Sequence, residues 1–173
     1  MIFCKGIVVN GAFYIFGKVG NNTFRKDDVM IEQDTIKLLR ECDAGVKMGV
    51  SSIDDVLKYA YSPDLKNFLV DSKQKHNELD EEIQKALDRF HDDGKEPNPI
   101  AKSMSWLKTN MKLIVNESDG TIADLITDGC NMGVKSLNMY LNKYEAADEK
   151  SKEITKKLID LEEKLAIDIR RFL

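Results

Sequence analysis

A short stretch of sequence that occurs twice constrains the fold of this chain more than any other feature. The first copy, CDAGVK, covers Cys42–Lys47, and the second copy, CNMGVK, covers Cys130–Lys135 and begins 88 positions later. Each copy lies inside a long segment whose apolar residues recur with the period of a helix. The repeat therefore predicts two related helical halves and not two copies of a loop motif.

Capping residues divide the chain from Asp34 onward into helical segments. Asp34 is a suitable N-cap for the first helix, and Ser62 followed by Pro63 is a typical start for the second. Asn98 with Pro99 begins a shorter helix, and Thr121 begins the fourth after a break at residues 116–120. The predicted helices cover residues 35–59, 63–90, 98–115, 121–144 and 148–172.

The four long predicted helices each carry an apolar stripe along one face. These stripes place Cys42 and Cys130 inward, on the first and fourth helices. In the second helix Ser72 and His76 interrupt the stripe, and in the fifth helix Glu162 lies at its edge. We expect the two cysteines to behave as small buried hydrophobes, and His76 to bond to Ser72 or to a facing polar group.

The connection over residues 91–120 is long and carries its own short helix. Up-and-down bundles do not need such a connection, so its length predicts an all-α bundle made of two hairpins with one long crossover. The repeated helices then run antiparallel across the core. Gly45 and Gly49 on one helix, with Gly129 and Gly133 on the other, are predicted to let these two helices approach closely.

The N-terminal residues allow two interpretations. The segment Ile7–Phe16 has Asn10-Gly11 at its centre, between β-branched and aromatic residues, and this pattern predicts a β-hairpin. Alternatively, residues 25–29 back-translate to a purine-rich ribosome-binding sequence, so that translation starts at Met30 and residues 1–29 are translated upstream sequence. In both cases we divide the chain into an extension, residues 1–33, and a helical bundle, residues 34–173.

The charge and cysteine content exclude several classes of function. The chain has 26 basic and 30 acidic residues, which are interleaved along the predicted helices and give a net charge of −4. This pattern is typical of solvated helix surfaces and does not favour nucleic-acid binding. No segment has the length of a membrane span. Three cysteines without a secretory signal indicate reduced thiols, so we expect a cytoplasmic protein.

Three stretches resemble the ferritin-like superfamily of duplicated helical hairpins, and within it the small bacterial ferritin-like bundle proteins of unassigned function. They are Leu38–Gly45, Pro97–Trp106 and Asp128–Gly133, and the resemblance covers residues 34–173. It implies a ferritin-like bundle, and in the active members of that superfamily two metals bind between the four helices through glutamates and Glu-x-x-His motifs. Lys73 stands three positions before His76, where this motif requires glutamate.

The residues left as candidate metal ligands are His76, Glu162, Cys130 and Glu41, and iron, manganese or zinc are the ions to consider. Superposing the second helix on the fifth at an offset of 86 places Glu162 at the position of His76. Folding the first hairpin at Ser62 puts Cys42 about 10 Å from the level of His76, so these two cannot share an ion. Cys130 and Glu162 are predicted to lie closer together along the bundle axis than Cys42 and His76 do.

Two functional hypotheses follow from the sequence. The first is a cytoplasmic bundle without a complete di-metal motif or cofactor, acting as an interaction or structural protein and forming a homodimer. The second is a divergent metal-binding or redox protein, in iron handling or peroxide defence, that uses His76 and Glu162. No other catalytic constellation is present in the sequence, so we expect no enzyme. The second hypothesis requires His76 and Glu162 to converge within a few ångströms, and the first predicts that they are apart.

Overall fold

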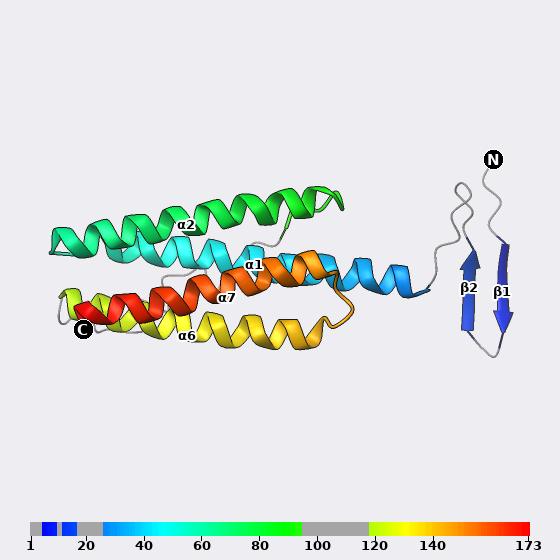
Figure 1. Cartoon of the computed structure of the whole chain (residues 1–173). Helices are drawn as coiled ribbons and strands as arrows, with labels where there is room; N and C mark the ends of the chain where they lie inside the picture. The colour runs from blue at the N-terminus through cyan, green and yellow to red at the C-terminus, as the bar shows by residue number, and fades with distance from the viewer. Residues whose placement is uncertain (1–4, 10–11, 17–25, 95–117) are drawn as a thin grey trace.

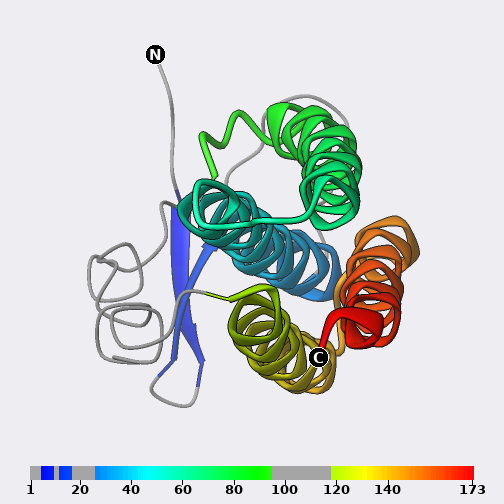
Figure 2. The ribbon, with the colours of Figure 1, turned by 90° about the vertical axis from the view of Figure 1, so that its left-hand side faces the viewer.

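A computed structural model describes residues 5–9, 12–16, 26–94 and 118–173 of the 173-residue chain. Four long helices form a bundle (Figure 1). The short helix predicted over residues 98–115 lies outside the described residues. In the end-on view of Figure 2 the helices follow one another around the bundle in the order α1, α2, α7, α6. The helices are α1 (Lys26–Leu57), α2 (Pro63–Asp88), α6 (Asp119–Lys143) and α7 (Glu149–Asp168), and a short 3-10 turn, η1 (Ile169–Phe172), follows α7.

Two short strands precede the helices. Strand β1 (Lys5–Val9) pairs with β2 (Ala12–Phe16) in an antiparallel register that sets Val9 opposite Ala12. Only two residues, Asn10 and Gly11, separate the strands, which agrees with the hairpin predicted from the Asn-Gly pair. The alternative, that translation starts at Met30, stays a prediction.

Helix α1 begins eight residues earlier than the N-cap predicted at Asp34. It starts at Lys26, because residues 26–33 contain neither glycine nor proline and the acidic Asp27 and Asp28 favour the first turn of a helix. Residues 28–33 are all exposed, whereas Thr35 is buried. The predicted boundary between residues 33 and 34 is therefore wrong as a helix start, although it marks where α1 enters the packed bundle.

Side-chain bonds at the two ends of the bundle establish the crossover. The backbone N–H groups of Tyr61 and Ser62 donate to the Asp119 carboxylate at 2.8 and 3.1 Å, so α6 begins beside the turn between α1 and α2. At the other end, the N–H of Asp148 donates to Thr35 Oγ1 at 2.8 Å. Since Asp92, at the end of α2, also bonds near this second end, to Arg40, the connection over residues 95–117 joins opposite ends of the bundle.

The N-cap predicted at Ser62 is confirmed, whereas the start predicted for the fourth helix differs. Ser62 Oγ accepts from Leu65 N, and Asp148 accepts from Ser151 N, as expected for the starts of α2 and α7. The fourth helix, however, starts at Asp119 and not at Thr121. The cap is Ser118, which accepts from Thr121 N, because Gly120 in the first turn does not prevent the helix from forming.

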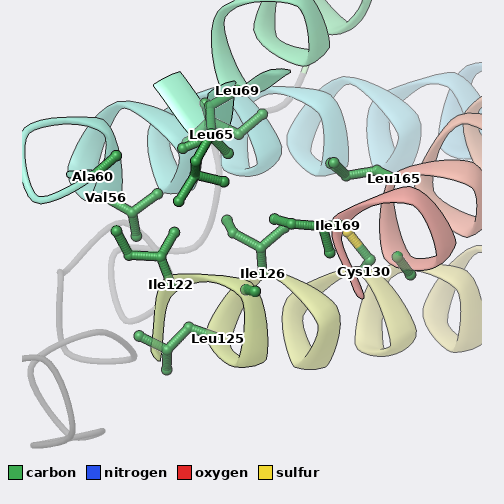
Figure 3. Packing of buried hydrophobic residues seen from close by; sticks show 13 residues of the cluster. Val56, Ala60, Leu65, Leu69, Ile122, Leu125, Ile126, Cys130, Leu165 and Ile169 are labelled. Atoms are coloured by element: carbon green, nitrogen blue, oxygen red, sulfur yellow. The ribbon is translucent and has the colours of Figure 1, made fainter. Parts of the chain in front are cut away.

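The core consists of two main apolar clusters. One lies at the end of the bundle with the α1–α2 turn, and Figure 3 shows residues of all four helices converging there. The other lies toward the opposite end and includes Leu39, Val46, Leu79 and Leu158. Val56 of α1 packs in the same cluster as Ile122 of α6, which agrees with the antiparallel arrangement predicted for the repeated helices.

The buried positions of the second hairpin repeat those of the first. Six buried residues of α2 shift by 86 positions onto six buried residues of α7 and η1, and the N-caps Ser62 and Asp148 are related in the same way. This correspondence supports the internal duplication predicted from the repeated hexapeptide. The pairs are Leu65 with Ser151, Leu69 with Thr155, Ser72 with Leu158, His76 with Glu162, Leu79 with Leu165, and Ile83 with Ile169.

None of the helices in the described part of the chain combines the length and the apolar composition needed to cross a membrane.

Candidate functional site

The two apolar clusters are separated by a polar level at which His76 and Glu162 meet. His76 lies on α2 between Leu69 and Leu79, and Glu162 lies on α7. The His76 Nε2 atom is 3.3 Å from Glu162 Oε1, and the two residues are 0% and 8% exposed. The condition set by the metal-binding hypothesis, convergence within a few ångströms, is thus met, and the separation predicted by the first hypothesis is wrong.

The second ring nitrogen of His76 fixes the tautomer. His76 Nδ1 lies 2.8 Å from the backbone carbonyl of Ser72, and because a carbonyl oxygen can only accept, Nδ1 must carry a hydrogen. The predicted link to Ser72 is therefore present, but through its main chain, since its hydroxyl donates to the carbonyl of Phe68. A hydrogen bond between Nε2 and Oε1 then needs one further proton, which either the ring or the carboxyl group can hold.

The surroundings of His76 act on its pKa in opposite directions. Burial disfavours the charged ring and lowers the pKa, while the hydrogen bond and charge of Glu162, together with the Ser72 carbonyl, raise it. The net effect is a pKa above the ordinary histidine value. This direction favours an imidazolium ring paired with the Glu162 carboxylate.

Cys130 of α6 completes this level of the core. It is 3% exposed, and burial, the nearby charge of Glu162 and a hydrogen bond to that carboxylate all raise the pKa of its thiol. The thiol therefore stays neutral and is a poor nucleophile, because reactivity requires the thiolate.

Cys42, the other repeated cysteine, lies at a different level. Its Sγ atom is 3.2 Å from Thr155 Oγ1, and burial raises the pKa of its thiol to about 12. Thr155 precedes Glu162 by seven residues on α7, which is about 10 Å along a helix axis. Both cysteines are free and buried, as their inward positions predict, and Cys42 does not reach the level of His76.

Two glycines make room for the polar level. A Cβ atom at Gly49 of α1 would lie 2.9 Å from His76 Cδ2, and one at Gly133 of α6 would lie 3.6 Å from Glu162 Cδ. The sequence predicts that these glycines bring α1 and α6 together. Instead, the nearest atoms to Gly49 and Gly133 belong to side chains of α2 and α7, so the glycines accommodate His76 and Glu162.

Glu41, the fourth candidate ligand, is not part of this level. It precedes Gly49 by eight residues on α1, or about 12 Å along the helix, and its charge acts on Cys42. Within residues 28–94 and 118–173, no group of three histidine, cysteine or acidic side chains is arranged to hold a metal ion. The structure therefore brings together His76, Glu162 and Cys130 of the four predicted ligands, without forming a metal-binding geometry.

A second buried acid was not expected from the sequence. Asp43 of α1 is 0% exposed, because Gln84 donates to its carboxylate, Lys47 pairs with it at 3.1 Å, and the backbone of Gly94 closes over it. The only sequence signal was the difference between the repeats, which have Asp43 in the first copy and the exposed Asn131 in the second.

A hollow lies on the surface between α1 and α2, and neither His76 nor Glu162 lines it. It has a volume of about 290 Å³, and its lining is largely acidic and polar. The residues that line it are Lys47, Val50, Ser51, Asp54, Asp55, Asn77 and Asp80.

Comparisons with protein-family models, with curated proteins and with solved structures give no significant match to this chain. The resemblance to the ferritin-like superfamily therefore stays a prediction that rests on the three stretches of sequence.

Proposed function

We propose that this protein is a cytoplasmic interaction or structural protein that forms a homodimer. The observation that carries the proposal is the part of α1 that extends past the bundle, where three consecutive apolar residues are exposed. Val29, Met30 and Ile31 are 42%, 49% and 41% exposed, and residues 28–33 contribute nothing to the buried core (Figure 1). Adjacent exposed apolar residues are typical of contact surfaces, whereas isolated ones are common on any protein.

The bundle itself supports this class of function. Within the described residues, every buried side-chain nitrogen and oxygen has a hydrogen-bond partner inside the protein. The polar level is thus satisfied without a ligand, and its charged and hydrogen-bonding groups need no further partner for stability. The apolar residues of the α1 extension, in contrast, would gain roughly 1 kcal/mol each if a second chain buried the part of each side chain that is exposed.

The test is the molar mass in solution, measured by light scattering over a range of protein concentrations. We expect twice the chain mass of 19.7 kDa for the wild type, and the monomer mass for a Val29→Gln, Met30→Gln and Ile31→Gln variant. A matched control is Val70→Gln, which changes a single apolar residue that is 52% exposed on α2 and should remain dimeric. A monomeric wild type, or a dimeric triple variant, would contradict the proposal.

A second candidate function is supported by one specific observation. His76 Nδ1 donates to a backbone carbonyl and Nε2 faces Glu162, and metal-binding histidines are commonly oriented by such a carbonyl. The alternative is therefore a metal-binding or redox protein in which His76, Glu162 and Cys130 hold one iron, manganese or zinc ion. It requires Cys130 or another side chain to move, since these donors are not arranged around a common point.

Elemental analysis of protein purified without chelator distinguishes the two candidates. The metal hypothesis predicts a stoichiometric ion that is lost in a His76→Leu variant and retained in a His91→Asn variant, since His91 is exposed and lies past the C-terminal end of α2, far from this level. An absence of bound metal after incubation with each of the three ions would contradict it and leave the interaction protein as the proposal.

A further inference from the structure

The outer face of α6 differs in charge from the outer faces of α2 and α7, where exposed acidic and basic residues are mixed. Between residues 129 and 144, α6 contains no acidic residue, and its charged residues there are the exposed Lys135 and Lys143. Two large apolar side chains on this face, Met132 and Met139, are 57% and 55% exposed. Because they are seven residues apart, they lie in line along the helix. The face is thus apolar and basic, on a chain whose net charge is −4.

The α1 extension, residues 28–33, carries the opposite charge. Its three consecutive apolar residues stand between Asp28 and Glu32, and it contains no basic residue. Every residue of this segment is exposed. An apolar segment flanked by acids is complementary to an apolar helix face that carries lysines.

We propose that the α1 extension of each copy packs on the outer face of α6 of a second copy, so that two identical contacts close a twofold dimer. This inference rests on the proposed function, a homodimer formed through the α1 extension, and it names the surface that the extension contacts. The extension lies beyond the end of its own α6, so it cannot cover that helix within one chain (Figure 1).

The positions of the two surfaces along the bundle allow both contacts to form at once. Leu38 of α1 packs with Tyr144, just after α6, so these two residues mark one level of the bundle. Met30, in the extension, precedes Leu38 by eight residues and lies about 12 Å outside this level. Lys135 precedes Tyr144 by nine residues and lies about 13 Å inside it. A twofold axis perpendicular to the bundle and close to this level therefore sets each extension beside α6 of the second copy.

The same axis brings the two helices into a matching direction. Helices α1 and α6 run antiparallel within one chain, and the axis reverses the second copy, so α1 of one copy runs parallel to α6 of the other. Val29 precedes Glu32 by three residues, and Met132 precedes Lys135 by the same number, so each pair shares one helix face. In a parallel arrangement the apolar side chains of the two pairs meet, and the acid lies beside the lysine.

The molar mass of the full chain, measured by light scattering over a range of concentrations, tests this contact. We expect the monomer mass for a Met132→Gln and Met139→Gln variant. The matched control is a Val70→Gln and Ile167→Gln variant, which changes two equally exposed apolar residues of α2 and α7 and should remain dimeric. All four residues are on the surface, so circular dichroism should show unchanged helix content in both variants.

The outcomes separate this inference from the proposed function. A dimeric methionine variant, together with a monomeric variant of the α1 extension, would overturn the contact with α6 and leave the dimer through the extension intact. A monomeric wild type would overturn both. A wild-type mass that keeps rising with concentration would also overturn the inference, because contacts that do not close by symmetry form open chains.

Charge reversal gives a second readout of the same contact. Glu32→Lys alone, or Lys135→Glu alone, places like charges together at both contacts and should raise the dissociation constant of the dimer roughly tenfold. The variant with both changes restores opposite charges and keeps the net charge of the wild type, so its dissociation constant should return close to the wild-type value. Effects of the two single changes that add in the double variant would overturn the pairing of these surfaces.

Discussion

The first hairpin places His76 at the position where the second hairpin, shifted by 86 residues, places Glu162, and the two side chains meet across the core. Around them the hairpins correspond closely, since both have a capped second helix and the same spacing of buried residues. The comparison shows that two hairpins of the same architecture can carry different residues at equivalent central positions. Two equal side chains at these positions would repel or leave a donor unmatched, whereas an imidazole and a carboxylate can share a proton.

The largest expected effect comes from removing one member of this pair. Glu162→Met should lower the free energy of unfolding by about 3 kcal/mol, because it leaves Nε2 of a buried His76 without a partner. Replacing both residues, in a His76→Leu and Glu162→Met variant, should recover most of this loss, since an apolar level needs no proton. Urea unfolding near neutral pH measures both. A double variant that loses the sum of two large single losses would contradict a coupled pair.

The next effect distinguishes the glycines of the two hairpins. Gly49→Ala should lower the free energy of unfolding by about 1 to 3 kcal/mol, because its Cβ would lie 2.9 Å from the His76 ring, which Glu162 holds in place. Gly133→Ala is the matched control, because its nearest contact is an ordinary 3.6 Å. We expect it to be neutral or stabilising by up to about 1 kcal/mol, since alanine favours a helix. Equal losses would show that the two glycines play the same role.

The N-caps of α2 and α7 should respond alike. Ser62→Ala and Asp148→Ala each remove a side-chain acceptor for a backbone N–H, from Leu65 and Ser151 respectively, and each should lower the free energy of unfolding by about 1 kcal/mol. Thermal or urea unfolding of the two variants, with Ser136→Ala on α6 as a mid-helix control, measures this. A large cost for only one cap would mean that the hairpins contribute unequally at their turns.

The smallest effect concerns a contact on the first hairpin. Arg40 donates two hydrogen bonds to Asp92, at 2.8 and 2.6 Å, and these bonds lower the pKa of the Asp92 carboxyl. Because the Arg40 side chain is 47% exposed, Arg40→Ala should cost less than about 1 kcal/mol. The contribution is present above the ordinary aspartate pKa of about 3.9 and is lost as the pH falls through the lowered value. The urea midpoint of Asp92→Asn should therefore fall less in acid than that of the wild type.

Most of the helices and the N-terminal hairpin could be predicted from the sequence, because they depend on local signals. Helical period, the cap at Ser62 and the Asn-Gly pair are short-range features, and the repeat indicated which helices correspond. The start of α1 was predicted wrongly for a related reason. A polar residue such as Asp34 resembles a cap, but nothing before it prevents a helix, so α1 continues to Lys26.

The candidate site was only partly predictable, because its geometry depends on contacts between helices. The offset of 86 placed Glu162 at the position equivalent to His76, yet equivalence in a duplicated fold does not by itself bring two residues into contact. They meet because α2 and α7 pack against each other and both side chains point into the core between them. The burial of Asp43 was missed for the same reason, since Gln84 and Gly94 cover it only after α2 folds back along α1.

The protonation of the His76 ring nitrogens tests the central claim most directly. It can be followed by ¹⁵N NMR of histidine-labelled protein over a pH titration, in the wild type and in Glu162→Gln. We predict that Nδ1 stays protonated throughout, and that Nε2 of the wild type loses its proton only above the ordinary histidine range and at a higher pH than in the variant. Loss of the Nε2 proton at the same pH in both proteins would contradict the claim that Glu162 holds that proton in place.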